Sequence, residues 1–145
     1  MVKKTKLDNI FMQKYQHLLS KVRLGDIYVE TDSRKDVKVK DHPYYKALVS
    51  KDDRSLKHFV NSHGQAHQKR QTNTLQGLFK LVDALRETFN PNKDPIELMQ
   101  NKKTRKYIAK HGRHRCCCLL YIYGPDKELV LVDNKRVVHV TNGNN

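Results

Sequence analysis

The segment Lys110–Arg115 joins a β-prone run to an apolar helical run through a single glycine, and this junction constrains the fold more than any other part of the chain. Tyr107–Ala109 favours a strand, and Cys116–Tyr123 favours a helix. Gly112 lies between them, where the lack of a Cβ lets the backbone turn sharply and approach a ligand closely. The N-terminus of the helix that follows presents N–H groups to an anion, and two arginines and two histidines lie in the same segment. The segment therefore predicts a phosphate-binding turn.

The chain is strongly basic. Its 145 residues include 29 Lys and Arg against 15 Asp and Glu, which is a formal net charge of +14. A field of this sign and size favours polyanions and speeds their association. Nucleic acid, DNA more than RNA, is therefore the expected partner, with a nucleotide as the smaller alternative. The remaining interpretation is a highly solvated surface without such a partner.

The sequence predicts a cytoplasmic protein, or one of the host cytoplasm if the chain is viral. It contains no run of about 18 apolar residues, so no membrane partner is expected. Met1–Lys4 is not followed by the apolar core of a signal peptide. The three cysteines, Cys116–Cys118, are consecutive, which excludes a disulfide framework. Because neighbours on a helix point about 100° apart, we interpret these cysteines as small core residues and predict no metal site.

The pattern of apolar residues predicts an α+β fold. Residues 1–23 combine helical spacing with many lysines, which favours a basic amphipathic N-terminal helix; residues 24–140 then form the domain, and residues 141–145 a frayed tail. Within the domain we expect, in order, a strand at Leu24–Glu30, a loop at Thr31–Lys40, helices at Pro43–Val49 and Asp53–His63, a helix capped by Thr74 that runs to Phe89, strands at Pro95–Met99 and Arg105–Ala109, the helix Cys116–Tyr123, and strands at Glu128–Val132 and Arg136–Val140.

Four short motifs occur in a suggestive order: Leu24–Ile27, Asp41–Tyr45, Pro95–Leu98 and Gly112–Arg115. This order resembles the ParB/sulfiredoxin superfamily, particularly its small ParB-like members, many of which are phage-encoded. The resemblance covers residues 22 to about 140. It implies a small mixed β-sheet with flanking helices and a phosphate site at the glycine turn. Because the superfamily includes partition proteins, kinases and nucleases, the fold by itself does not determine the chemistry.

The departures from the family pattern narrow this chemistry. Sulfiredoxins carry a reactive cysteine between the glycine and the histidine, where this chain has Arg113, so the resemblance argues against sulfinic acid reduction. Many ParB-like members have an acidic residue just before the glycine, where this chain has His111. The second nucleotide-contacting box of partition proteins is not recognisable. A nucleotide switch is therefore not predicted.

The candidate binding residues lie in two places. Gly112, Arg113, His114 and Arg115 are the candidates for a phosphate or nucleotide, since Arg clamps phosphate with two parallel hydrogen bonds. The candidates for contact with a nucleic-acid backbone are Lys69, Arg70, Lys110, Arg113 and Arg115.

The candidate catalytic residues are His114 and Glu30. An imidazole titrates near neutrality and can act as acid or base, and a carboxylate near the first strand, Glu30 or Asp26, suits a Mg²⁺-dependent reaction. Their alternatives are a positioning histidine and a solvated strand end. His63 and His67 have zinc-like spacing, but Gly64 interrupts the helix and no Glu follows His63, so no metal site is predicted there.

Three functions are compatible with these residues. The first is a ParB-like protein that binds nucleic acid through the turn. The second is a Mg²⁺-dependent phosphotransferase or nuclease, for which a nucleotide and Mg²⁺ are the candidate cofactors. The third is a basic interaction protein that binds an acidic host partner. No P-loop motif is present, which removes the commonest NTPase mechanism.

Overall fold

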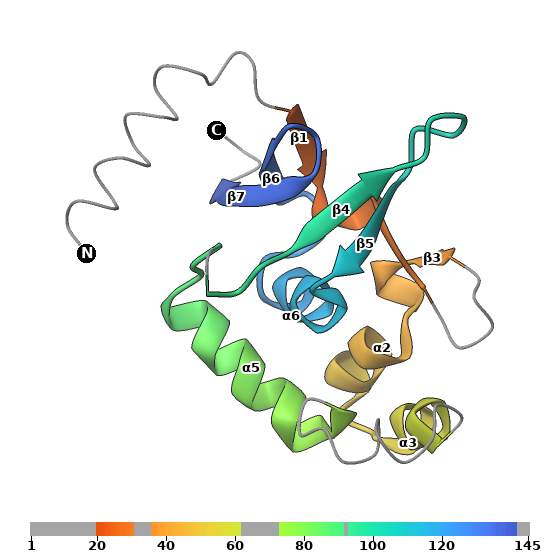
Figure 1. Cartoon of the computed structure of the whole chain (residues 1–145). Coiled ribbons are helices and arrows are strands. Elements are labelled where there is room, and N and C mark those ends of the chain that lie inside the picture. Colours follow the sequence, from red (N-terminus) through yellow and green to blue (C-terminus); the bar gives the residue numbers. More distant parts are fainter. Residues whose placement is uncertain (1–19, 31–35, 62–72, 92, 142–145) are drawn as a thin grey trace.

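The described residues form a curled sheet of seven short strands and four α-helices, of which α6 packs against the sheet and the others pack around α6 and α2 (Figure 1). The computed structural model describes residues 20–30, 36–61, 73–91 and 93–141. The strands are β1 (Ser20–Arg23), β2 (Ile27–Glu30), β3 (Asp36–Lys38), β4 (Glu97–Gln100), β5 (Tyr107–His111), β6 (Glu128–Val132) and β7 (Arg136–Thr141). The α-helices are α2 (Pro43–Ser50), α3 (Arg54–Asn61), α5 (Leu75–Glu87) and α6 (Arg113–Tyr123), and two short 3₁₀ helices are η2 (Leu24–Asp26) and η3 (Val39–Asp41). The predicted α+β class is confirmed.

The sheet has the order β1-β6-β7-β4-β5-β2-β3. Neighbouring strands are antiparallel except for β2 and β5, which are parallel. The four strands predicted in the C-terminal half are present, and they pair in sequence order as β4 with β5 and β6 with β7. Asp133 and Asn134 connect β6 to β7 with φ of 53° and 58°, the left-handed conformation that tight hairpin turns require.

Local capping signals place the starts of α2 and α5. Thr74 Oγ1 accepts a hydrogen bond from Gly77 N at 3.0 Å, as the sequence predicts for the start of α5. His42 caps α2, and Pro43 occupies its first turn, where a missing N–H costs nothing. Both helix starts are therefore confirmed, and α5 ends at Glu87, two residues before the predicted end.

Helix α6 lies between the sheet and helices α2 and α5 (Figure 1). Cys116–Cys118 and the two leucines that follow them are all buried, which confirms the cysteines as core residues. A helix that is covered on most sides needs small or apolar residues around its whole circumference. The rest of the core comes from alternate strand positions such as Ile27 and Val29 and from the inner faces of the other helices.

Residues 20–23 are a strand, although the sequence predicts a helix over residues 1–23. In β1, Val22 is buried while Lys21 and Arg23 are exposed, and this alternation matches a strand paired with β6. The rest of the predicted N-terminal helix lies outside the described residues. The chain then makes the 3₁₀ turn η2, so the predicted strand at Leu24–Glu30 begins only at Ile27.

Two further boundaries differ from the prediction. Asp36–Lys38 forms the edge strand β3 within the predicted loop, because it pairs with β2, a partner that local sequence does not reveal. Helix α6 begins at Arg113 rather than Cys116, since Gly112 alone makes the turn. No helix in the described ranges combines the length and the apolar character needed to cross a membrane.

Candidate functional site

Gly112 sets the geometry of the predicted turn. It has φ 87° and ψ 29°, and a Cβ there would lie 2.8 Å from both Ile96 Cγ1 and the carbonyl oxygen of Pro95. Only glycine fits both the left-handed backbone and the close approach of the segment that enters β4. Cys116 N donates to Gly112 O at 2.8 Å, which is the first hydrogen bond of α6. The preceding N–H groups of residues 113–115 therefore have no acceptor within the helix and lie at its positive end.

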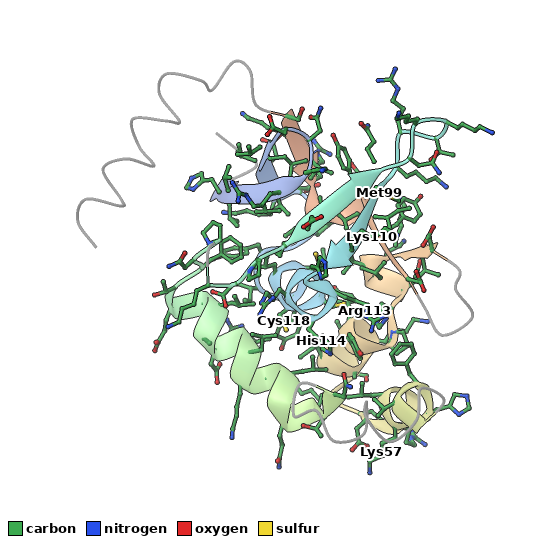
Figure 2. The ribbon with its side chains drawn as sticks, viewed as in Figure 1. Lys57, Met99, Lys110, Arg113, His114 and Cys118 are labelled. Atoms are coloured by element: carbon green, nitrogen blue, oxygen red, sulfur yellow. The ribbon has the colours of Figure 1, made fainter. Side chains whose placement is uncertain are left out.

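Arg113 ties the start of α6 to the end of β2. Its Nη1 donates to the carbonyl oxygen of Glu30 at 3.0 Å. Its guanidinium carbon lies 5.4 Å from the ring centre of Tyr44 and 5.6 Å from that of Phe59, within the range of cation–π attraction. Figure 2 shows Arg113 and His114 at the start of α6, on the side of α2. The guanidinium is thus held in one place and half-buried.

His114 is fixed by a stack and a hydrogen bond. Its ring is stacked on that of Tyr44, with centroids 4.3 Å apart and planes 19° apart. Its Nε2 lies 2.7 Å from Asn73 Oδ1, which also accepts a hydrogen bond from Tyr44 Oη at 2.9 Å. Because the amide oxygen only accepts, His114 donates through Nε2. A proton transfer by His114 would then use Nδ1 or break the bond to Asn73.

The partners of His114 are themselves buried. Tyr44 is 0% exposed, His42 0% and Asn73 4%. His42 Nδ1 accepts a hydrogen bond from Tyr44 N at 3.1 Å, and its ring lies 4.4 Å from Tyr44 and 4.9 Å from Phe59. Residues far apart in the chain therefore form one cluster at the start of α6, which we call the Tyr44 cluster: His42, Tyr44, Phe59, Asn73 and His114. Such burial leaves the groups little freedom to rearrange when a ligand binds.

Arg115 anchors the other side of the turn. Its Nη1 donates to the carbonyl oxygen of Pro95 at 3.1 Å, and its Nε lies 3.9 Å from Asp94 Oδ1. Both side chains of this ion pair are partly exposed, so its contribution to stability is modest. The two arginines consequently brace the start of α6 against the end of β2 on one side and the entry to β4 on the other.

The other predicted site residues have different positions. Lys110 is exposed on β5, next to the turn. Glu30 is exposed at the end of β2, and its main-chain carbonyl rather than its carboxylate meets Arg113. Asp26 is exposed in η2, away from the turn, in the hollow between β1 and β2. The predicted nucleic-acid contacts Lys69 and Arg70, like His63 and His67, lie outside the described residues.

Across the described residues, no group of three His, Cys, Asp or Glu side chains gathers in a way that suits a metal ion. The cysteines next to the turn are poor nucleophiles in this state, because burial raises the pKa of Cys116 and of Cys118 to about 12. Burial also raises the pKa of Cys117 well above its usual value.

Sequence reasoning missed Asn73 and Tyr44 as parts of the site. Asn73 ends a polar stretch and precedes the capping Thr74, a position typical of solvated loops. Tyr44 belongs to the Asp41–Tyr45 motif, and no pattern in the sequence connects it to the glycine turn. Nothing in the local pattern links either residue to His114, because Asn73 lies 41 positions and Tyr44 lies 70 positions before it.

No family model, no curated protein and no solved structure matches this chain. The candidate function therefore depends on the site itself.

Proposed function

We propose that this chain is a nucleic-acid-binding protein of ParB/sulfiredoxin-like architecture, which holds a backbone phosphate at Gly112–Arg115. The observation that carries the proposal is the bracing of two arginines around an open helix start. The main-chain N–H groups of residues 113–115 lie at this helix start, and the guanidinium groups of Arg113 and Arg115 flank it on opposite sides. An anion bound there meets donors that are already positioned, which lowers the entropic cost of binding.

The two guanidinium groups retain donors for a phosphate. A guanidinium carries five N–H groups, and the hydrogen bonds to Glu30 and to Pro95 each use one. The His114 ring helps to fix the same turn, because it stacks on the buried ring of Tyr44. We assign His114 the role of positioning the turn, because its Nε2 is engaged with Asn73.

The net charge favours a polymer over a single nucleotide. A formal charge of +14 attracts a polyanion through many weak phosphate contacts, each of which releases counterions. DNA, which the sequence analysis favours over RNA, is the first ligand to test. The ParB/sulfiredoxin-like part of the proposal is supported by the order of elements: strand β2, helix α2, the hairpin β4–β5, then the glycine turn that opens α6.

The test is a titration of the protein into fluorescently labelled DNA at several salt concentrations, with fluorescence anisotropy as the measure of binding. We expect the affinity to fall steeply with salt, and Arg113→Gln and Arg115→Gln each to weaken binding about tenfold, the effect of about 1.4 kcal/mol for one lost charged contact. Glutamine keeps a donor for the carbonyl that each arginine contacts. Arg86→Gln, at an exposed position on α5, is the matched control and should bind within about twofold of the wild type.

Two outcomes would change the proposal. Thermal melting of each variant first establishes that the fold is intact. If both turn variants bind DNA as tightly as the Arg86 variant, the turn is not the phosphate site and the proposal fails. The same titrations with Mg²⁺ address the enzymatic alternative, in which the exposed carboxylate of Glu30 at the end of β2 would hold the metal ion. Cleavage of the DNA that needs Mg²⁺ and is lost in Glu30→Gln would replace a binding function by nuclease activity.

A further inference from the structure

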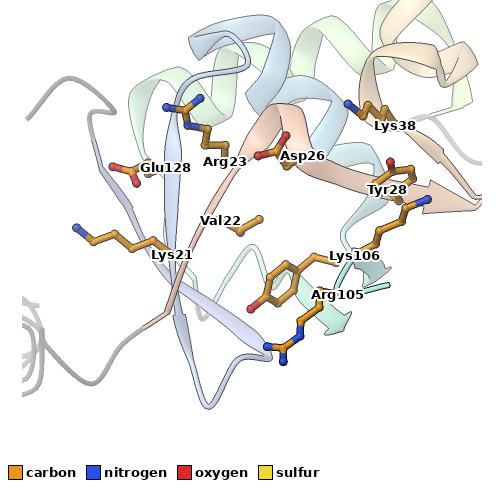
Figure 3. Close-up of a pocket in the computed structure, with 10 residues that line it drawn as sticks. Lys21, Val22, Arg23, Asp26, Tyr28, Lys38, Arg105, Lys106 and Glu128 are labelled. Atoms are coloured by element: carbon orange, nitrogen blue, oxygen red, sulfur yellow. The ribbon is translucent and has the colours of Figure 1, made fainter. Parts of the chain in front are cut away.

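A basic hollow opens between β1 on one side and β2 and β5 on the other, with a volume of about 460 Å³ (Figure 3). Strands β1 and β2 are consecutive in the chain but far apart in the sheet order, and the curl of the sheet brings both to the same hollow. The lining residues are Lys21, Val22, Arg23, Asp26, Tyr28, Lys38, Arg105, Lys106, Tyr107 and Glu128. The volume falls in the range of pockets that enclose a bound group.

Cationic side chains dominate the lining. Five lysines and arginines face two carboxylates, those of Asp26 and Glu128. One of the arginines, Arg23, lies 3.8 Å from Asp126 in a pair that is largely exposed to solvent and therefore weak. The hollow thus keeps an excess of positive charge, and low-dielectric walls strengthen the attraction of such a cleft for an anion.

An aromatic ring accompanies this charge. Tyr28 is half-buried on β2, and Lys106 Nζ lies 4.7 Å from its ring centre. In Figure 3 the side chains of Tyr28, Lys38 and Lys106 lie close together at one end of the hollow. Tyr107 lines the same hollow from β5. Tyrosine rings beside lysine and arginine suit an unpaired base and its phosphate, since every base has a face that stacks.

The loop from β4 to β5 extends the basic lining and is internally braced. Asn101 Oδ1 accepts hydrogen bonds from Lys103 N and Thr104 N, and Arg105 N donates to Asn101 O at 2.7 Å. Arg105 takes a left-handed conformation, φ 64°, which is uncommon for a residue other than glycine. Lys102 and Lys103 are exposed on the same loop. Bracing of this kind presents the cations at a fixed place next to the hollow.

We propose that the hollow binds single-stranded nucleic acid, with a base on Tyr28 and backbone phosphates on Lys38, Arg105 and Lys106. An acidic peptide shares the charge requirement but has no use for the tyrosine faces, so the aromatic lining favours nucleic acid. The hollow and the glycine turn lie at opposite ends of β5, roughly 13 Å apart along the strand. This second site therefore goes beyond the proposed function and does not depend on it.

The experiment is a titration of fluorescein-labelled oligo(dT) into the full chain, followed by anisotropy at low and moderate salt. Tyr28→Ala should weaken binding about 5- to 150-fold, the range for one lost stacking contact. Tyr28→Phe keeps the ring and should bind within about threefold of the wild type. The double variant Lys38→Glu and Arg105→Glu should bind at least tenfold more weakly, with a shallower dependence on salt.

Matched controls separate the hollow from the overall charge and from the turn. Lys57→Glu with Arg86→Glu makes the same change of charge at exposed positions on α3 and α5 and should have a much smaller effect. The proposal is overturned if the hollow variants bind oligo(dT) like this control. It is also overturned if polyglutamate displaces oligo(dT) fully and Tyr28→Ala has no effect, the result expected of a site for acidic peptides.

The turn variant Arg113→Gln provides the last comparison. If it alone weakens binding, the proposed function stands and the hollow proposal fails. If only the hollow variants weaken binding, the hollow is the nucleic-acid site and the phosphate role of the turn fails.

Discussion

Replacing Gly112 by alanine tests whether the turn before α6 depends on glycine for two separate reasons. The first is the left-handed backbone, φ 87°, which costs an L-residue about 1–2 kcal/mol. The second is space, because the new Cβ would lie 2.8 Å from Ile96 Cγ1 and 2.8 Å from the carbonyl oxygen of Pro95. The carbonyl is backbone and receives a hydrogen bond from Arg115, so it moves only with the chain. Overpacking of this kind costs about 1–3 kcal/mol.

We therefore expect Gly112→Ala to lower the free energy of unfolding by about 2–5 kcal/mol. Gly124 is a comparison without the steric contact: it ends α6 with φ 87° and ψ 174°, a conformation that also favours glycine, and within the described structure no atom lies within 4 Å of a Cβ built there. Gly124→Ala should cost only the backbone part, about 1–3 kcal/mol. Urea unfolding followed by far-ultraviolet circular dichroism measures both values, with a wild-type reference in the same buffer.

Two results would refute this reasoning. If Gly112→Ala unfolds within about 1 kcal/mol of the wild type, neither the conformation nor the close approach constrains the turn. If the loss is no larger than the backbone cost of about 1–2 kcal/mol, the contact with the Pro95–Ile96 segment contributes nothing. Either result would mean that the turn is not rigid and does not hold Arg113 and Arg115 in fixed positions.

Two further predictions concern the core and the Tyr44 cluster. Burial raises the pKa values of Cys116–Cys118, to about 12 for the first and third, so only the unfolded chain releases these protons near pH 9. The free energy of unfolding is therefore highest below pH 9 and falls as the pH rises towards 12, by about 1.4 kcal/mol per pH unit for each thiol. Urea unfolding at several pH values measures this dependence. If the dependence on pH is as steep in Cys116→Ala as in the wild type, the reasoning is contradicted. Tyr44→Phe removes one donor to Asn73 but keeps the stack on His114, so we expect a loss of about 0.5–1.5 kcal/mol in the same assay, and a loss above 3 kcal/mol would mean that the hydroxyl has a further role.

Much of the secondary structure follows from local signals. The capping residue Thr74 and the proline after His42 locate the starts of α5 and α2, because caps and fixed φ angles act within a few residues. The same holds for the C-terminal hairpin, whose two β-prone runs are separated by the turn residues Asp133 and Asn134. The prediction of a helix through Arg23 was wrong where the structure describes it, since residues 20–23 pair with β6 more than 100 positions later. Pairing at such a distance leaves only a weak trace in the local pattern.

The candidate site, too, was predicted from the sequence only in part. The sequence alone placed a glycine, two arginines and a histidine at the start of an apolar helix, because a glycine between two periodic runs has few other uses. It did not indicate that the arginines would contact main-chain carbonyls, or that Asn73 and Tyr44 would hold His114. These contacts come from segments that meet only when α2, α5 and α6 pack together.

The sequence by itself determined the class of fold, the charge and the position of the turn, since each depends on residue type and short-range spacing. The tertiary structure decided which groups at the turn are engaged in hydrogen bonds, and it assembled the basic hollow from β1, β2 and β5. The physical reason is the curl of the sheet. It brings strands that are distant in sheet order to one cavity, and no periodicity in the chain encodes that approach.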